Sequence, residues 1–251
     1  MVEALEWFSR EIPAYYLQVS GVDRRLLDGI DLPGLKVLDV GCGIHLYDDV
    51  WMALRGADVT GIDYDVEMIR AAGERLKEAD GRGLIDGLAI RIETGDGRHL
   101  DFDDCTFDVV TSFSAIEHMP SGADRLAAVR EMSRVVKRGG VVVLTGPNFL
   151  PLPVTLLSRL FFRRVKQFEH RYTPWELKRM LTSSGLDVER FDAESLYTID
   201  ERLVRTRFPW LRSVPMAFFR PLVVLLRLFN SSRRLKFLGM RIGYRARKPL
   251  T

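Results

Sequence analysis

Cysteine and long hydrophobic runs are scarce in this sequence. Its 251 residues include two cysteines, Cys42 and Cys105, which are too few for the disulfide framework of a small secreted protein. No stretch reaches the roughly 18 uninterrupted apolar residues expected of a membrane-spanning helix. The first residues, MVEALEWFSREIP, also lack the basic start and apolar centre of a signal peptide. These absences predict a cytoplasmic protein.

The histidines are few and scattered, and their spacing is not typical of metal ligands. They are His45, His99, His118 and His170. We therefore expect no bound metal. In other respects the composition is that of an ordinary globular protein, with 47% hydrophobic and 28% charged residues. A chain of this length can bury a full core and suits one domain with extensions, or one and a half domains.

Short apolar runs alternate with helical patterns along most of the chain. The expected strands cover residues 37–40, 58–63, 88–92, 107–113, 141–145, 186–191 and 240–246. Between the second and third, the stripe Val66, Ile69, Ala72 and Leu76 has helical spacing. Such alternation predicts an α/β fold with a doubly wound, mostly parallel, seven-stranded sheet that helices cover on both faces.

Three regions are expected within this fold. Residues 1–30 form an N-terminal helical cap, residues 31–195 form the ligand-binding core, and residues 196–251 hold a basic, apolar insertion followed by the last strand. Two short sequence motifs mark expected boundaries of elements within the core. Residues 138–140 (Arg-Gly-Gly) read as a turn before the fifth strand, and residues 173–176 (Thr-Pro-Trp-Glu) have the capping-box arrangement that starts a helix.

The first strand runs into a glycine turn, in the stretch KVLDVGCGIHLYDDV at residues 36–50. A dinucleotide fingerprint requires glycine at the first, third and sixth positions of such a turn, and this chain has Gly41 and Gly43 but Leu46. A phosphate-binding loop would require a following Gly-Lys-Ser or Gly-Lys-Thr, which is missing. The turn therefore does not fit NAD or a nucleoside triphosphate.

Acidic residues follow three of the expected strands. Asp39 precedes Gly41 by two residues, Asp63 closes the second strand, and Asp96 follows the third. Because parallel strands end at one edge of the sheet, the three carboxylates should lie at the edge where such folds bind ligands. This arrangement favours a ligand that carries hydroxyls, amines or a positive charge.

At these residues the sequence resembles the class I S-adenosylmethionine-dependent methyltransferases, over roughly residues 30–195. The matching motifs are VLDVGCG (37–43), TGIDYD (60–65), GDGRHLDF (95–102), FDVVTSFSAIEHMP (107–120) and VVKRGGVVVLTGPN (135–148). Residues 168–191 are similar to the helix and strand that follow the core in the small-molecule branch. The chain departs from the family pattern at His45, where many members have a third glycine.

The resemblance implies S-adenosylmethionine as cofactor and a set of residues that hold it. Asp63 would bind the two ribose hydroxyls with Tyr64 beside the adenine, and Asp96 would accept from the adenine amine. The remaining expected cofactor contacts are Asp39, Gly41, Cys42, Gly43, Gly97, Arg98 and Ser112. In relatives the N-terminal segment, here with Tyr15 and Tyr16, folds over the cofactor as a lid, although plain core packing of these tyrosines is an equal alternative.

Methyl transfer is an in-line displacement, so alignment of the reactants is the main requirement. For a hydroxyl acceptor a base would help, and His118, after the fourth strand, is the expected catalytic residue. The alternative is that His118 orders the loop before Pro120. Some relatives hold a metal with Glu-x-x-Glu-His, but Ser114 replaces the first glutamate here. His170 is a further candidate near the acceptor, although a structural role is commoner in such a loop.

The C-terminal region is strongly basic. Residues 202–251 contain thirteen of the 37 Lys and Arg residues and none of the 34 Asp and Glu residues. Residues 214–229 could form an interfacial helix with a basic face, and residues 156–166 have a similar mixture. An anionic membrane surface is therefore a candidate partner. The alternative is that the apolar residues pack on the sheet and the arginines form a solvated face.

We expect a methyltransferase that acts at oxygen on a small, lipid-like or lipid-linked acceptor, at the inner face of a membrane. An RNA methyltransferase is a second reading, which the missing Asn/Asp-Pro-Pro-aromatic motif after the fourth strand makes weaker. A non-catalytic, cofactor-binding regulator is the third.

Overall fold

The computed structural model describes residues 2–10, 21–150, 169–194, 236–239 and 241–251. Tyr15 and Tyr16, the basic stretch 156–166, the expected helix 214–229 and most of the insertion before the last strand lie outside the described residues.

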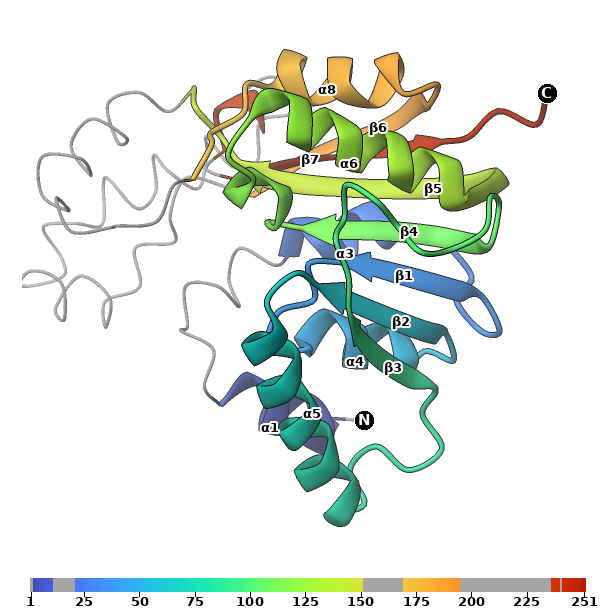
Figure 1. Ribbon diagram of the computed structural model, residues 1–251, viewed down its shortest axis with the longest axis vertical. Helices are drawn as coiled ribbons and strands as arrows, with labels where there is room; N and C mark the ends of the chain where they lie inside the picture. The colour runs from blue at the N-terminus through green and yellow to red at the C-terminus, as the bar shows by residue number, and fades with distance from the viewer. Residues whose placement is uncertain (1, 11–20, 151–168, 195–235, 240) are drawn as a thin grey trace, which may run out of the picture.

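Seven strands form one sheet in the order β3-β2-β1-β4-β5-β7-β6 (Figure 1). Their bounds are β1 Lys36–Val40, β2 Asp58–Asp63, β3 Ile90–Thr94, β4 Phe107–Phe113, β5 Val136–Pro147, β6 Asp187–Glu194 and β7 Arg241–Arg247. Strands β1 to β5 are parallel, and β7 lies antiparallel between β5 and β6. The expected doubly wound, mostly parallel, seven-stranded sheet is confirmed.

Helices cover both faces of this sheet. The described helices are α1 Val2–Ser9, α3 Gly21–Leu27, α4 Tyr47–Ala53, α5 Val66–Gly81, α6 Gly122–Val135 and α8 Pro174–Ser183, with short 3-10 turns η1 Ile116–His118 and η4 Lys236–Leu238. Helices α6 and α8 lie on one face and α3 and α4 on the other (Figure 1).

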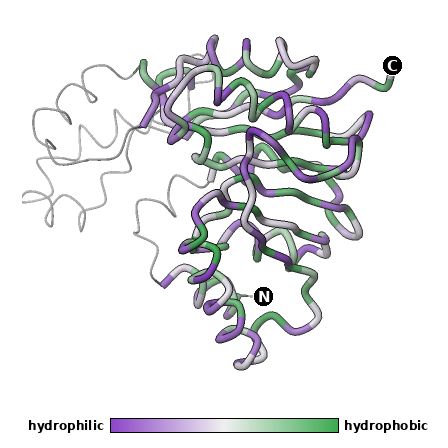
Figure 2. The backbone as a smooth tube through the Cα atoms, in the orientation of Figure 1, coloured by the Kyte–Doolittle hydropathy of each residue, from purple (hydrophilic) through white to green (hydrophobic). Residues whose placement is uncertain are grey.

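Side chains that alternate between the two faces of the sheet form two hydrophobic cores, one on each face. On β1, Leu38 belongs to the same buried cluster as Met132 of α6, whereas the neighbouring Val37 belongs to the cluster that contains Met52 of α4, because successive side chains point to opposite faces. Figure 2 shows the hydrophobic positions concentrated along the strands in the middle of the molecule. Burial on both faces explains why β1 and residues 141–144 of β5 read as nearly continuous apolar runs.

Helix starts follow the local capping signals. The Thr173 side chain accepts from the Glu176 amide, and the Glu176 side chain accepts from the Thr173 amide, which confirms the capping box at α8. At α5 the Asp65 side chain accepts from two amides of the first turn. The helix boundaries near the site are therefore set by residues within a few positions of each start.

The glycine pair before the fifth strand is not a turn. Strand β5 begins at Val136 and includes Gly139 and Gly140, which exchange backbone hydrogen bonds with Lys248. A side chain on Gly140 would lie 2.7 Å from the Asp108 carbonyl oxygen, and Gly139 has a positive φ of 75°. The glycines permit an irregular strand that the C-terminal residues hold from the other side.

Two smaller expectations are also wrong. Strand β3 begins at Ile90, two residues after the expected start, because residues 85–88 close a turn in which the Leu88 amide donates to the Ile85 carbonyl. Val66 of the expected apolar stripe is 61% exposed, since the first buried residue of α5 is Ala72, nearly two turns later.

Candidate active site

The three predicted acids meet at the carboxyl edge of β1, β2 and β3. Asp39 pairs in register with Gly61, and Asp63 with Thr94, two residues before Asp96. The fold therefore brings together carboxylates that are far apart in the sequence, as parallel strand pairing requires.

The glycine turn after β1 is built by close backbone approach. The amides of Gly41 and Cys42 both donate to the Ile62 carbonyl, at 2.8 and 3.0 Å. Gly41 has a φ of 87°, and a side chain there would lie 2.2 Å from the Ala115 Cβ, so only glycine fits. Gly43 has a φ of 60°, but nothing lies within 4 Å of a Cβ placed on it. The turn therefore leaves room beside Gly43 for a ligand to approach the backbone.

Asp63 connects this turn to the second strand. Its Oδ2 accepts from the Gly43 amide and its Oδ1 from the Asp65 amide, both at 3.0 Å. Each carboxylate oxygen has a second lone pair, so the side chain can still accept from ligand hydroxyls. The neighbouring Tyr64 is 72% exposed.

Asp96 is already paired. Arg98 donates from Nε to Oδ1 at 2.9 Å and from Nη2 to Oδ2 at 2.7 Å, and its Nη1 reaches Asp124 at 3.2 Å. The bidentate contact lowers the pKa of Asp96, so this carboxyl is ionised at neutral pH. Gly97 is required by packing, since a side chain there would lie 2.9 Å from Val40 Cγ1. An adenine amine would have to share Asp96 with Arg98.

Asp39 lies deepest among the three acids. It is 4% exposed, and its Oδ1 accepts from the Thr111 hydroxyl at 2.5 Å. Burial raises the pKa of Asp39 to about 7. Next along β4, the fully buried Ser112 donates to the Val40 carbonyl at 2.9 Å, which braces β4 against β1. Burial also raises the pKa of the Cys42 thiol, so Cys42 is no nucleophile.

Two further acids stand at the start of α4, directly after the glycine turn. Asp49 is 1% exposed, and burial raises its pKa well above the usual range. The Oδ1 atoms of Asp48 and Asp49 accept no hydrogen bond from the described residues. Sequence reasoning missed both, although an acidic pair in the first turn after Gly43 was a readable signal. The buried edge therefore carries more carboxyl groups than the three strand ends supply, and burial favours their neutral form.

One arginine faces this group of acids without an ion pair in the described part of the chain. The Arg24 guanidinium, on α3, lies 4.8 Å from the centroid of the Tyr47 ring and 5.9 Å from that of Trp51. Its Nε is buried and donates to none of the residues that the structure describes. Nothing in the local sequence pointed to Arg24, because α3 and α4 meet only in the fold. It can hold a carboxylate beside a site that is otherwise acidic.

The predicted catalytic residue, His118, lies in η1 at the end of β4 and is exposed. Its neighbour Glu117 is 2% exposed, and burial raises the pKa of Glu117 to about 8. The Glu117 carbonyl accepts from the His170 amide at 2.9 Å, and the His170 ring contacts Glu176 Oε1 at 2.7 Å. These contacts make His170 a structural link between η1 and α8.

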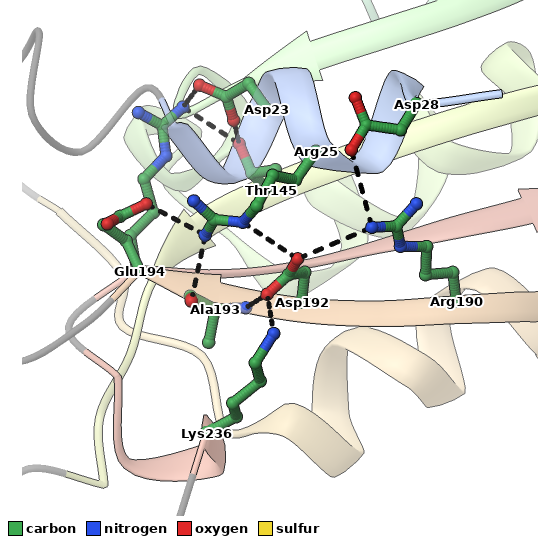
Figure 3. Close-up of polar contacts among 10 residues, drawn as sticks. Asp23, Arg25, Asp28, Thr145, Arg190, Asp192, Ala193, Glu194 and Lys236 are labelled. Carbon is green, nitrogen blue, oxygen red and sulfur yellow. Dashed lines mark hydrogen bonds and ion pairs between the residues drawn. The ribbon is translucent and has the colours of Figure 1, made fainter. Parts of the chain in front are cut away.

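Polar contacts tie α3 to the last strands of the sheet (Figure 3). Thr145 donates to Asp23 Oδ1 and accepts from Arg241, which also pairs with Asp23 at 2.8 Å. Asp192, 2% exposed, accepts from Arg25 at 3.0 Å and from Lys236 at 2.7 Å.

The Asp192 contacts hold residues 194 and 236, the two described ends of the insertion. Glu194 also pairs with Arg25, at 3.0 Å (Figure 3). The insertion therefore leaves and rejoins the fold at one place beside α3.

The described residues hold no group of three or more His, Cys, Asp or Glu side chains placed to bind a metal. None of the helices in the described ranges has the length and apolar character that crossing a bilayer requires.

The carboxyl edge fits the chemistry of S-adenosylmethionine. Buried acids around the glycine turn match the positive charges of a sulfonium and an ammonium, and Asp63 matches the ribose hydroxyls. Arg24 is a cation that could pair with the carboxylate of the same ligand. The open space beside Gly43 admits the chain that joins these groups.

Comparisons with known proteins agree with a methyltransferase fold. A model described as "Methyltransferase domain" matches residues 38–144. Over 188 residues the chain is 31% identical to a ubiquinone biosynthesis O-methyltransferase of Psychrobacter arcticus, covering 72% of this chain and 69% of that protein. It is 32% identical over 180 residues to the protein of that name from Pseudomonas aeruginosa, covering 69% and 72%.

Among solved structures, magnesium protoporphyrin IX methyltransferase from Synechocystis, with bound SAH, superposes with a TM-score of 0.61 at 15% identity, covering 98% of this chain and 94% of that one. Fold, site and sequence relatives thus agree on an enzyme that uses S-adenosylmethionine. The chain belongs to the class I S-adenosylmethionine-dependent methyltransferases.

Proposed function

We propose that the enzyme transfers the methyl group to a hydroxyl oxygen of a small, lipid-like or lipid-linked acceptor at a membrane surface. The observation that carries the first half is the acid-lined glycine turn at the carboxyl edge, where Asp63 is bonded to the Gly43 amide. The second half is supported by the relatives, which are named as O-methyltransferases of ubiquinone biosynthesis. Ubiquinone is itself lipid-soluble, so its precursors are acceptors of the proposed kind.

The residues of the chain mainly bind and orient. S-adenosylmethionine, when bound, supplies an electrophilic methyl group on a sulfonium. Asp63 holds the ribose, Asp39 faces the positive end of the methionine portion, and Arg24 holds its carboxylate. Fixing the cofactor at three points removes most of its freedom before the reaction, which is the main catalytic contribution that a protein makes to such a displacement.

The acceptor hydroxyl must lose its proton when its oxygen bonds to the methyl carbon and the carbon–sulfur bond breaks. We place His118 next to that oxygen, because η1 follows β4 at the reacting edge. Its neutral imidazole takes the proton and later releases it to water. Glu117 lies behind it and is largely neutral at pH 7, since its pKa is raised to about 8.

Charge supports the membrane part of the proposal. Of the thirteen basic residues in 202–251, the structure engages four with acids of the core: Lys236 with Asp192, Arg241 with Asp23, and both Arg245 and Arg247 with Glu189. Eight arginines and no acid remain between residues 202 and 234. That stretch is also rich in aliphatic and aromatic residues, which favours an anionic lipid surface over nucleic acid.

The deciding experiment offers labelled S-adenosylmethionine and the enzyme to lipid, small-molecule and RNA fractions of a cell extract. Label in the lipid fraction, lost with Asp63→Ala, supports the proposal. Label only in RNA would replace it with the RNA methyltransferase, and cofactor binding without transfer to any fraction would favour a regulator.

A further inference from the structure

Exposed aromatic side chains lie on three elements that meet near the end of β5. Phe149 follows β5 and is 40% exposed, Trp175 lies in the first turn of α8 and is 66% exposed, and Phe237 lies in η4 and is 38% exposed. We call these three residues the aromatic face. Large exposed aromatics on separate elements are uncommon without a partner.

Backbone contacts bring the three elements together. The Phe149 amide donates to the Tyr172 carbonyl at 2.8 Å, three residues before Trp175. The fully buried Asn148 donates from Nδ2 to the carbonyls of Phe237 and Gly239, both at 2.7 Å. Figure 1 shows α8 starting at the end of the sheet where β5 ends. One buried amide therefore fixes two of the aromatic positions, and the Tyr172 bridge fixes the third.

Helix α8 adds positive charge beside Trp175. Leu177, Met180 and Leu181 face the core, while Lys178 and Arg179 are exposed three and four positions after Trp175, on the same side of the helix. The acid in this turn, Glu176, is already engaged by His170 and by the Thr173 amide. The outer side of α8 thus presents a tryptophan with two cations.

We propose that the aromatic face, with Lys178 and Arg179, lies on the surface of an anionic lipid bilayer. Tryptophan and phenylalanine favour the interface between acyl chains and headgroups, and lysine and arginine pair there with anionic lipids. Charge complementarity favours an anionic bilayer as the partner. Residues 202–234 are rich in arginine and belong to the insertion whose two described ends, Glu194 and Lys236, lie beside η4. This inference rests on the proposed lipid-like acceptor and adds the surface that meets the membrane.

The fluorescence of Trp175 can show how deeply this side chain enters the lipid bilayer. Trp7 is 9% exposed and the Trp51 ring is covered by the Arg55 guanidinium at 3.7 Å, so with Trp210→Phe as background Trp175 is the tryptophan placed to meet lipid. Vesicles contain equal parts of phosphatidylcholine and phosphatidylglycerol, with bromines on the upper acyl chain. We expect the brominated lipid to quench the fluorescence, and the quenching to disappear with Trp175→Phe.

A charge-reversal pair tests the same face by sedimentation with these vesicles. Lys178→Glu with Arg179→Glu should weaken binding by about tenfold or more, from the usual contribution of a basic residue near an anionic surface. The matched control, Lys77→Glu with Arg130→Glu, makes the same charge change at exposed positions of α5 and α6 and should weaken binding far less.

The inference would be overturned if the protein sediments with vesicles but the fluorescence of Trp175 is not quenched. It would also be overturned if the two charge-reversed pairs lose vesicle binding equally. Methyl transfer to an acceptor dispersed in detergent is measured on the same variants. If the variants still transfer methyl groups but the aromatic face does not bind vesicles, only the present inference is contradicted. If the wild type transfers no methyl group, only the proposed function is contradicted.

Discussion

The Asp63 carboxylate accepts a hydrogen bond from the Gly43 amide at 3.0 Å, so the end of β2 holds the glycine turn that follows β1. Asp63→Ala removes both this contact and the proposed acceptor for the ribose hydroxyls. Hydrogen bonds to charged groups contribute about 1.5–3 kcal/mol each, so we expect at least about tenfold weaker binding of S-adenosylmethionine. Isothermal titration calorimetry measures the dissociation constant of S-adenosylmethionine for both proteins. Asp58→Ala, at the opposite end of the same strand, is the control, and equal affinities of the two variants would place the ribose elsewhere.

Arg24 should matter only for ligands that carry a carboxylate. We expect Arg24→Gln to weaken S-adenosylmethionine and S-adenosylhomocysteine by about tenfold, the usual loss for a charged hydrogen bond. Methylthioadenosine lacks the amino-acid portion and serves as the matched ligand, so its dissociation constant should not change. A uniform loss for all three ligands would mean that Arg24 supports α4 through Tyr47 rather than binding the carboxylate.

Cofactor affinity should rise with pH and level off above about pH 7. Burial raises the pKa of Asp39 to about 7, and a cationic ligand binds the ionised carboxyl better, so binding must release the proton that Asp39 holds at lower pH. Calorimetry at pH 6, 7 and 8 in two buffers of different ionisation enthalpy measures that release. Asp39→Asn should abolish it. A pH profile shared by both proteins would assign the proton to another group.

His118→Ala should lower turnover far more than cofactor affinity. General-base assistance typically contributes about 100-fold or more, whereas an exposed side chain in η1 contributes little to the cofactor site. Single-turnover rates and cofactor dissociation constants are measured on the same preparation. A fall in rate of less than about threefold would leave His118 as a residue that orders η1.

Glu117 should make the free enzyme less stable as the pH rises. Its pKa is 4.5 in the unfolded chain and about 8 when buried, so the folded state binds the extra proton and loses stability between these values, by about 1.4 kcal/mol per pH unit. Glu117→Gln should lack this component, so its urea stability relative to wild type improves from pH 5 to pH 8. Glu131→Gln is the control with opposite sign, because Arg134 helps to hold the pKa of Glu131 low. Parallel curves for Glu117→Gln and wild type would contradict the assignment.

Much of the fold was readable from local patterns. The apolar runs marked all seven strands, because most strands of this sheet carry buried side chains, although β3 has none. Asp39, Asp63 and Asp96 marked the carboxyl edge, where we propose that the ligand binds. What could not be read depends on contacts across the chain. Gly139 and Gly140 look like a turn until Lys248 pairs with them.

The site shows the same division between local and distant contacts. The start of α4 carried a visible acidic pair, but the position of Arg24 over Tyr47 follows only from the packing of α3 on α4. Asp96 appeared available to a ligand, yet Arg98, two residues away, occupies it, and nothing in the spacing distinguishes an arginine that turns toward the acid from one that points to solvent.

The place of β7 between β5 and β6 has a consequence for biosynthesis. Strand β6 is translated well before β7 and has no neighbour to pair with until residues 241–247 have left the ribosome. Until then the nascent chain exposes the open edge of β5, with Val142 and Leu144 uncovered on one side. Closure of the sheet is therefore a late event, and chains that stall or are cut before Arg241 present the kind of unpaired apolar edge that chaperones and proteases bind.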